Sequence, residues 1–112
     1  MVVYNMTSPK TGNPVANQFI ISEKTDKSNR LIFQSYKSKI IDIDFFNSTI
    51  TFGEDWNYSR TTAKYRNEFL NEYFPQLADT KKLKALEQVV RANNGQIEMQ
   101  LGITIYTIKF EQ

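Results

Sequence analysis

The chain contains no cysteine and no histidine. Without cysteine it cannot form a disulfide, a cysteine-ligated zinc site or a thiol nucleophile. Without histidine it lacks the commonest general base at neutral pH and the commonest ligand of transition metals. A Ser–His–Asp triad is therefore excluded. These absences favour a binding protein over an enzyme, and we expect no cofactor.

Long apolar runs and a strong excess of one charge are lacking too. No stretch approaches the roughly 18 consecutive apolar residues that a membrane span requires. Residues 1–10 lack the basic and apolar regions of a secretory signal. The net charge is +2, which is too small to require a polyanionic partner. We therefore expect a cytoplasmic protein that does not bind membranes.

The length and the aromatic content predict one folded core. The chain has 112 residues, with eight Phe, six Tyr and one Trp, and domains of about 100–150 residues are the commonest size. No internal repeat or linker divides the sequence. A single domain over residues 1–112 is expected.

Short apolar segments in the first half predict four antiparallel strands. The turn-rich residues 8–14 are expected to precede the first strand. Apolar residues 19–21 and 31–33 flank a polar segment, which predicts a hairpin with a long polar tip. Residues 41–45 alternate between apolar and acidic, as in a strand with one buried face. Residues 49–52 are rich in β-branched types and complete the set.

Two amphipathic helices are predicted next. Ser59 is suited to accept a hydrogen bond from a first helical turn, and Pro75 ends the helix that follows. Asp79 is the expected N-cap of a second helix, which ends near Asn93 before a left-handed stop at Gly95. The two apolar faces are expected to comprise Tyr65, Phe69, Leu70, Tyr73 and Phe74, and Leu83, Leu86, Val89 and Val90.

The residue types of segment 96–110 favour β-strand, and two arrangements of this segment remain possible. A two-residue turn at Leu101-Gly102 would make a hairpin, and the absence of a turn would make one long bent strand. In the hairpin, Ile97, Met99, Tyr106, Ile108 and Phe110 would share one face. Either way the order ββββ–αα–ββ predicts an α+β domain in which a mainly antiparallel sheet of about six strands packs with two helices.

A row of cations is expected on the side of the second helix opposite its apolar face. Such a row is typical of a surface that binds nucleic-acid phosphates. By base rate, however, such a row is more often a solvated helix face. The cations concerned are Lys81, Lys82, Lys84 and Arg91 in the second helix and Arg60, Lys64 and Arg66 around the first.

Acidic residues form a second group of candidates. Asp42 and Asp44 lie on one face of a strand with Lys39 nearby, a pattern found in magnesium-dependent nucleases. The same alternation also describes the wet face of a half-buried strand. Together with Glu54 and Asp55 they could instead imitate DNA phosphates or dock on a basic protein groove.

Aromatic residues supply a third group. Tyr36, Tyr58 and Tyr65 would support nucleic-acid binding through base stacking if they were exposed. Trp56 and Arg60 flank the start of the first helix, and both are residue types enriched at protein–protein hot spots. We expect Trp56 to pack in the core and Arg60 to face a partner.

Five segments of the sequence stand out together. They are TSPKTG at residues 7–12, NQF at 17–19, FQSYKS at 33–38, WNYSRTT at 56–62 and KYRNEFL at 64–70. In this order they resemble a family of short, uncharacterised proteins carried by phages and plasmids of Gram-positive bacteria. The resemblance covers roughly residues 6–72 and contains no catalytic motif, whereas residues 79–112 look unlike the shorter members.

The resemblance implies a protein of a mobile genetic element acting in a host bacterial cell. In size, lack of cysteine and lack of a catalytic motif, the chain is similar to the anti-CRISPR proteins that inhibit Cas9 in Firmicutes. The leading expectation is therefore a non-enzymatic, stoichiometric inhibitor that binds Cas9 or its guide RNA complex. The second is a nucleic-acid-binding accessory protein of phage or plasmid replication, and the third is a small metal nuclease. The sequence does not predict the oligomeric state.

Overall fold

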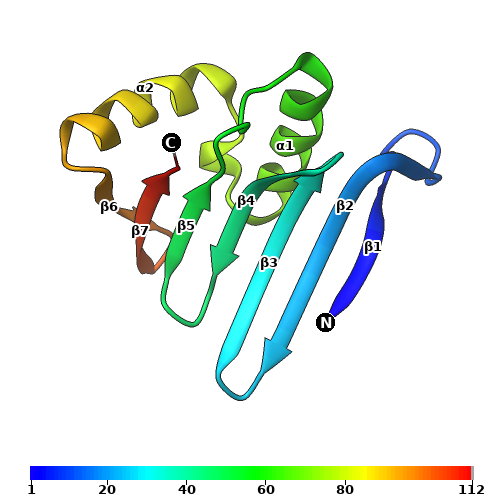
Figure 1. Cartoon of the computed structure of the whole chain (residues 1–112), viewed down its shortest axis with the longest axis horizontal. Coiled ribbons are helices and arrows are strands. Elements are labelled where there is room, and N and C mark those ends of the chain that lie inside the picture. Colours follow the sequence, from blue (N-terminus) through cyan, green and yellow to red (C-terminus); the bar gives the residue numbers. More distant parts are fainter. Residues whose placement is uncertain (112) are drawn as a thin grey trace.

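The computed structural model describes residues 1–111 as one seven-stranded sheet with both helices on the same side (Figure 1). This confirms the predicted α+β class and the order of strands, helices and strands, with seven strands rather than about six. The strands lie side by side in the order β1-β2-β3-β4-β5-β7-β6. The elements are β1 (Val2–Thr7), β2 (Pro14–Thr25), β3 (Ser28–Ser35), β4 (Ser38–Asp44), β5 (Thr49–Phe52), α1 (Arg60–Tyr73), a 3₁₀ turn η1 (Pro75–Leu77), α2 (Thr80–Ala92), β6 (Gln96–Leu101) and β7 (Thr104–Phe110).

The sheet is built from an antiparallel meander and a returning hairpin. Each of β1 to β4 pairs with the next strand in the chain. The chain then crosses over through both helices, and β7 lies parallel to β5, with β6 outside it. A parallel neighbour requires such a long crossover. The C-terminal hairpin is therefore part of the central sheet and not a separate tail.

The core lies between the helices and one face of the sheet. Ile41, Ile43 and Phe52 are fully buried on that face, and each contributes about 1.5–3 kcal/mol by leaving water. Leu70 from α1 and Leu83 from α2 are fully buried against them. No helix in the described chain is both long and apolar enough to cross a membrane.

Both helices begin and end where the sequence predicts. The Ser59 hydroxyl accepts a hydrogen bond from the amide of Thr62 at 3.1 Å, and the Asp79 carboxylate accepts from the amide of Lys82 at 3.0 Å. The predicted apolar faces need two corrections. Val89 is 53% exposed, and the stripe of α1 that faces the core includes the fully buried Arg66.

Removing the cap of α2 provides a pH-dependent test. Hydrogen bonds, chiefly from the Lys82 amide, hold the pKa of Asp79 below its ordinary value of 3.8. The stabilisation is therefore present above pH 3.8 and is lost as the pH falls through the lower, folded-state pKa. We expect Asp79→Ala to lower the melting temperature at pH 7, and the gap from the wild type to close on acidification below 3.8. A gap that is independent of pH in calorimetry would contradict this role of the carboxylate.

The first half of the chain departs from the prediction in two places. The sequence does not predict β1, because Val2, Val3 and Tyr4 are all exposed and show no alternation of polar and apolar residues. The β2–β3 hairpin has no long tip, because its strands extend to a two-residue turn at residues 26–27. One face of the sheet is open to solvent, so polar residues fit well in these strands.

Residues 96–110 form the hairpin and not the bent strand. Its turn is at Gly102-Ile103, one residue later than expected, and Gly102 has the positive φ of 69° that favours glycine. Met99 consequently pairs with Tyr106. Moving the turn by one residue changes the pairing register of β6 and β7 by two residues. Every side chain therefore stays on its predicted face of the sheet.

Candidate functional site

A cleft of about 680 Å³ lies where the β3–β4 turn meets the N-terminus of α1. Three segments that are distant in the sequence form it: the first half of β2, the β3–β4 turn, and the loop between β5 and α1. We call it the hydroxyl cleft. Its lining residues are Asn17, Ser35, Tyr36, Lys37, Ser38, Ile40, Asp55, Tyr58, Ser59, Thr61 and Thr62.

Hydroxyl groups dominate the chemistry of this cleft. Seven of its eleven lining side chains carry one, and each hydroxyl can both donate and accept a hydrogen bond. Lys37 is the one cation and Asp55 the one carboxylate among the lining residues. The inside of the cleft therefore suits a ligand with many hydrogen-bond donors and acceptors.

A network of short hydrogen bonds holds the floor of the hydroxyl cleft. The hydroxyls of Ser35 and Thr62 lie 3.0 Å apart and join β3 to α1. The Ser59 hydroxyl donates to that of Thr62 at 3.2 Å. The Ser38 hydroxyl donates to the Asp55 carboxylate at 2.7 Å, which ties the loop before α1 to β4. The floor is thus ordered before any ligand arrives.

Two tyrosines in the hydroxyl cleft expose their rings. Tyr36 is 51% exposed and Tyr58 is 75% exposed, whereas Tyr65 is half-buried. Tyr36 also has a positive φ of 56°, a conformation that bulky residues seldom adopt. Its amide donates to the Asn17 carbonyl at 2.7 Å, which holds the turn in place. An exposed aromatic ring on a strained turn is costly for stability and indicates a function.

Relieving this strain should separate stability from binding. We expect Tyr36→Asn to raise the free energy of unfolding by about 0.5–1 kcal/mol, because asparagine tolerates the left-handed conformation. The same change should weaken ligand binding, because the ring is lost. Urea denaturation of the variant and the wild type measures the first effect. A less stable variant would show that the ring supports the fold.

Arg66 holds the loop that carries Tyr58. Its guanidinium is fully buried and donates to the carbonyl of Trp56 at 2.9 Å, the side chain of Asn57 at 3.2 Å and the hydroxyl of Thr80 at 2.6 Å. It also lies 5.1 Å from the centre of the Trp56 ring. Burial lowers the pKa of Arg66 to about 10, so the side chain remains a cation at neutral pH. No carboxylate within residues 1–111 forms an ion pair with it.

Trp56 anchors the same loop in the core, as predicted. It is 5% exposed and meets the rings of Phe52 and Phe110 edge-on. Its indole nitrogen donates to the carboxylate of Glu87 on α2 at 3.0 Å. Gly53 begins the loop, and a β-carbon there would lie 1.9 Å from a backbone oxygen of β4. The loop is therefore held in place by the packing of Trp56 in the core and by the close approach of Gly53 to β4.

Positive potential is expected at the rim of the hydroxyl cleft. The first turn of α1 presents there the amides that Ser59 does not cap, and the positive end of the helix dipole adds to their effect. Arg60, the first residue of α1, is exposed beside the lining residues Ser59 and Thr61. Together with Lys37 this arrangement favours a phosphate or another anion at the rim.

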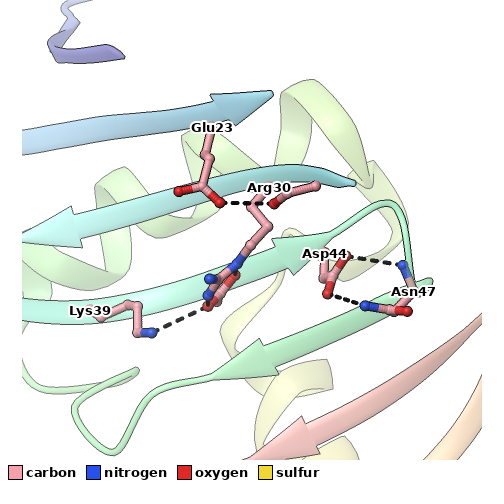
Figure 2. Close-up of polar contacts among 7 residues, drawn as sticks. Glu23, Arg30, Lys39, Asp44 and Asn47 are labelled. Atoms are coloured by element: carbon pink, nitrogen blue, oxygen red, sulfur yellow. Dashed lines mark hydrogen bonds and ion pairs between the residues drawn. The ribbon is translucent and has the colours of Figure 1, made fainter. Parts of the chain in front are cut away.

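The acidic pair of β4, Asp42 and Asp44, lies on the open face of the sheet and lines no part of the hydroxyl cleft. Figure 2 shows Asp44 with its partner Asn47. Arg30 and Lys39 both form ion pairs with Asp42. Burial raises the pKa of Asp44, but hydrogen bonds from Asn47 outweigh this effect and lower it overall. Cations and an amide thus already occupy both carboxylates, and no cluster of three potential metal ligands occurs within residues 1–111.

The remaining predicted residues are spread over the surface. Arg91 forms an ion pair with Glu87 at 2.9 Å, and the other three cations of α2 are exposed. On α1, Lys64 is exposed and Arg66 is buried, so the two do not form one charged surface. Glu54 is exposed next to Asp55. The exposed cations of α2 are Lys81, Lys82 and Lys84.

Comparison with known proteins links the chain to one family. Residues 1–90 match the model of a family of unknown function, DUF8033. The chain belongs to this family. No curated protein and no solved structure matches it. The matched region contains every lining residue of the hydroxyl cleft and α2 as far as Val90, and it excludes the C-terminal hairpin.

The sequence of this DUF8033 protein does not predict the cleft. It indicates Tyr36 and Tyr58 as stacking candidates and Asp55 as a separate acidic candidate, and it does not single out the hydroxyls of Ser35 and Thr62. A usable signal was present. The segments FQSYKS and WNYSRTT, which carried the resemblance, supply most of the lining residues, and Asn17 comes from NQF. These segments, which are distant in the sequence, therefore lie together around one cleft in the fold.

Proposed function

We propose that this protein is a non-enzymatic binding protein of a mobile genetic element whose hydroxyl cleft holds single-stranded nucleic acid. The observation that carries the proposal is the pair of exposed rings, Tyr36 and Tyr58, at the N-terminus of a helix. Unpaired bases stack on exposed aromatic rings whatever their identity. The backbone phosphate would lie against the free amides of α1, beside Arg60.

The shape of the site supports single strands over duplexes. A cleft of about 680 Å³ can accept individual bases, and its volume lies within the range of about 300–1,000 Å³ usual for small-ligand sites. Paired and stacked bases of a duplex offer no free faces to the two tyrosines. The hydroxyls of the cleft would contact base edges and sugars.

Binding of labelled oligonucleotides tests this function. Fluorescence anisotropy is measured with single-stranded DNA, single-stranded RNA and a duplex of the same sequence, each at several salt concentrations, because phosphate contacts depend on salt. We expect at least one single-stranded form to bind more tightly than the duplex. Equal affinity for all three, or no binding at low salt, would refute the proposal.

Inhibition of Cas9 by stoichiometric binding is the second function that we propose. It is supported by the resemblance and by the exposure of Tyr58 and Arg60, which are residue types that dominate protein–protein hot spots. Asp42 and Asp44 are poor candidates for imitating phosphates, because their carboxylates are already bound. Glu54, which is exposed next to the cleft residue Asp55, would meet a basic channel instead.

A cleavage assay separates the two functions. Guide-loaded Cas9 is titrated with the protein, and inhibition should reach a sharp endpoint near equimolar amounts. Unchanged cleavage in a large excess, whether the protein is added before or after the guide RNA, would eliminate Cas9 as the target. If competing single-stranded nucleic acid abolishes the inhibition, the inhibition results from nucleic-acid binding in the hydroxyl cleft.

A further inference from the structure

β1 is an outer strand of the sheet without the usual protection. It pairs only with β2, and its sequence VVYNMT contains no charged residue and no proline. Val2, Val3 and Tyr4 are 60%, 55% and 46% exposed. The register is irregular only between Asn5 and Thr7, so the first part of the strand is regular. Edge strands of natural proteins are usually blocked by charges, proline or bulges.

A hollow of about 390 Å³ adjoins β1 on the helix side of the sheet. Tyr4 pairs with the buried Ile20, so its side chain points toward this side. Glu68 and Glu72 of α1 contribute two carboxylates to the lining, and no cation lines the hollow. Oxygen Oε2 of Glu68 is buried and has no hydrogen-bond partner within residues 1–111.

The hollow also raises the pKa of a tyrosine. Burial, followed by the charge of Glu72 and the proximity of Tyr4, raises the pKa of Tyr73. Two tyrosines and two carboxylates therefore surround one small space. Aromatic faces and carboxylates together recognise the ammonium or guanidinium group of a basic side chain.

We infer that β1 binds an extended peptide as an eighth strand, and that a lysine or arginine of this peptide enters the hollow. The peptide backbone would pair with the free edge of β1, which is the usual mode of strand addition. Every second side chain would then face the helix side. A basic one would bond Glu68 and Glu72 with its charged end and pack its stem against Tyr4.

A second copy of the chain fits this edge less well. Its own β1 contains no lysine or arginine, so an antiparallel pair of β1 strands would leave the carboxylates of the hollow without a basic side chain. The opposite edge, β6, carries Glu98 and is protected by that charge. The β1 site shares no lining residue with the hydroxyl cleft, so it stands independently of the proposed nucleic-acid site.

Matched synthetic peptides test the inference. The probe is a labelled peptide of alternating valine and lysine, and the controls replace lysine with glutamate or methylate alternate backbone amides. We expect the lysine peptide to shift the NMR signals of the β1 amides. It should bind at least about tenfold more tightly than either control. Equal binding of the lysine and glutamate peptides, or no binding of either, would overturn the inference.

A double variant tests the hollow itself. Glu68→Gln with Glu72→Gln keeps the side-chain volume and should reduce the affinity for the lysine peptide about tenfold, without changing oligonucleotide binding. Glu98→Gln on the opposite edge is the matched control and should have no effect. Sedimentation could instead show a dimer in the absence of any peptide. If dimer formation perturbs the same β1 amides, the edge binds a second copy and the inference is refuted.

Discussion

Replacing Arg66 with methionine is expected to lower the free energy of unfolding by about 3 kcal/mol. The guanidinium satisfies the buried carbonyl of Trp56 and binds Asn57 and Thr80, so it connects the loop before α1 with the start of α2. Methionine fills a similar volume but donates no hydrogen bond. The variant removes the cost of burying a charge, which offsets part of the loss, but it leaves several polar groups without partners.

The control for this prediction is Arg60→Met on the same helix. Arg60 is exposed, so the change should alter stability by less than about 0.5 kcal/mol. Arg66→Lys should be nearly as harmful as Arg66→Met, because lysine keeps the buried charge but cannot reach all the acceptors of the planar guanidinium. Urea denaturation measures all three. If the Arg66→Met protein is as stable as the wild type, Arg66 does not hold the loop before α1.

The second large effect concerns binding rather than stability. Changing Tyr36 and Tyr58 together to alanine should weaken binding of single-stranded nucleic acid about 100-fold, because stacking contributes roughly 1–3 kcal/mol per base. Both rings are exposed, so little of the core depends on them. We therefore expect the double variant to unfold at nearly the same urea concentration as the wild type. Anisotropy titrations compare the affinities.

The matched control changes three cations of α2 to alanine. Lys81, Lys84 and Arg91 lie on the exposed side of the helix and line no part of the hydroxyl cleft. If the cleft is the site, this triple variant keeps most of its affinity and its salt dependence. If the row of cations is the site, the slope of affinity against salt becomes flatter, as each lost phosphate contact requires. An unaffected tyrosine variant together with a flattened slope would move the site to α2.

Local signals predicted the helices well. The caps at Ser59 and Asp79 depend on a few neighbouring residues, which is why a single sequence suffices to find them. Alternation also placed β4 and the faces of the C-terminal hairpin correctly. β1 could not be predicted in this way, because Val2, Val3 and Tyr4 are all exposed and its sequence carries no such alternation. It forms a strand because it pairs with β2, and its own sequence pattern does not indicate one.

The buried arginine and the cleft could not be predicted in the same way. Arg66 occupies the stripe of α1 that also buries Thr62 and Phe69, but arginine normally belongs to the surface, so it was counted among the exposed cations. The hydroxyl cleft brings together Asn17, Ser35 and Thr62 from three distant segments. Their convergence depends on the strand register, and the exposure of Tyr58 depends on how Arg66 holds its loop.

Photochemical crosslinking tests the central claim most directly. Single-stranded DNA and RNA containing a photoreactive uracil analogue are irradiated in complex with the whole protein, and the attached residues are identified by mass spectrometry. We expect crosslinks to Tyr36 and Tyr58, which lie in the hydroxyl cleft with their rings exposed. Crosslinks confined to the lysines of α2, or the absence of any crosslink from a bound oligonucleotide to the cleft, would contradict it.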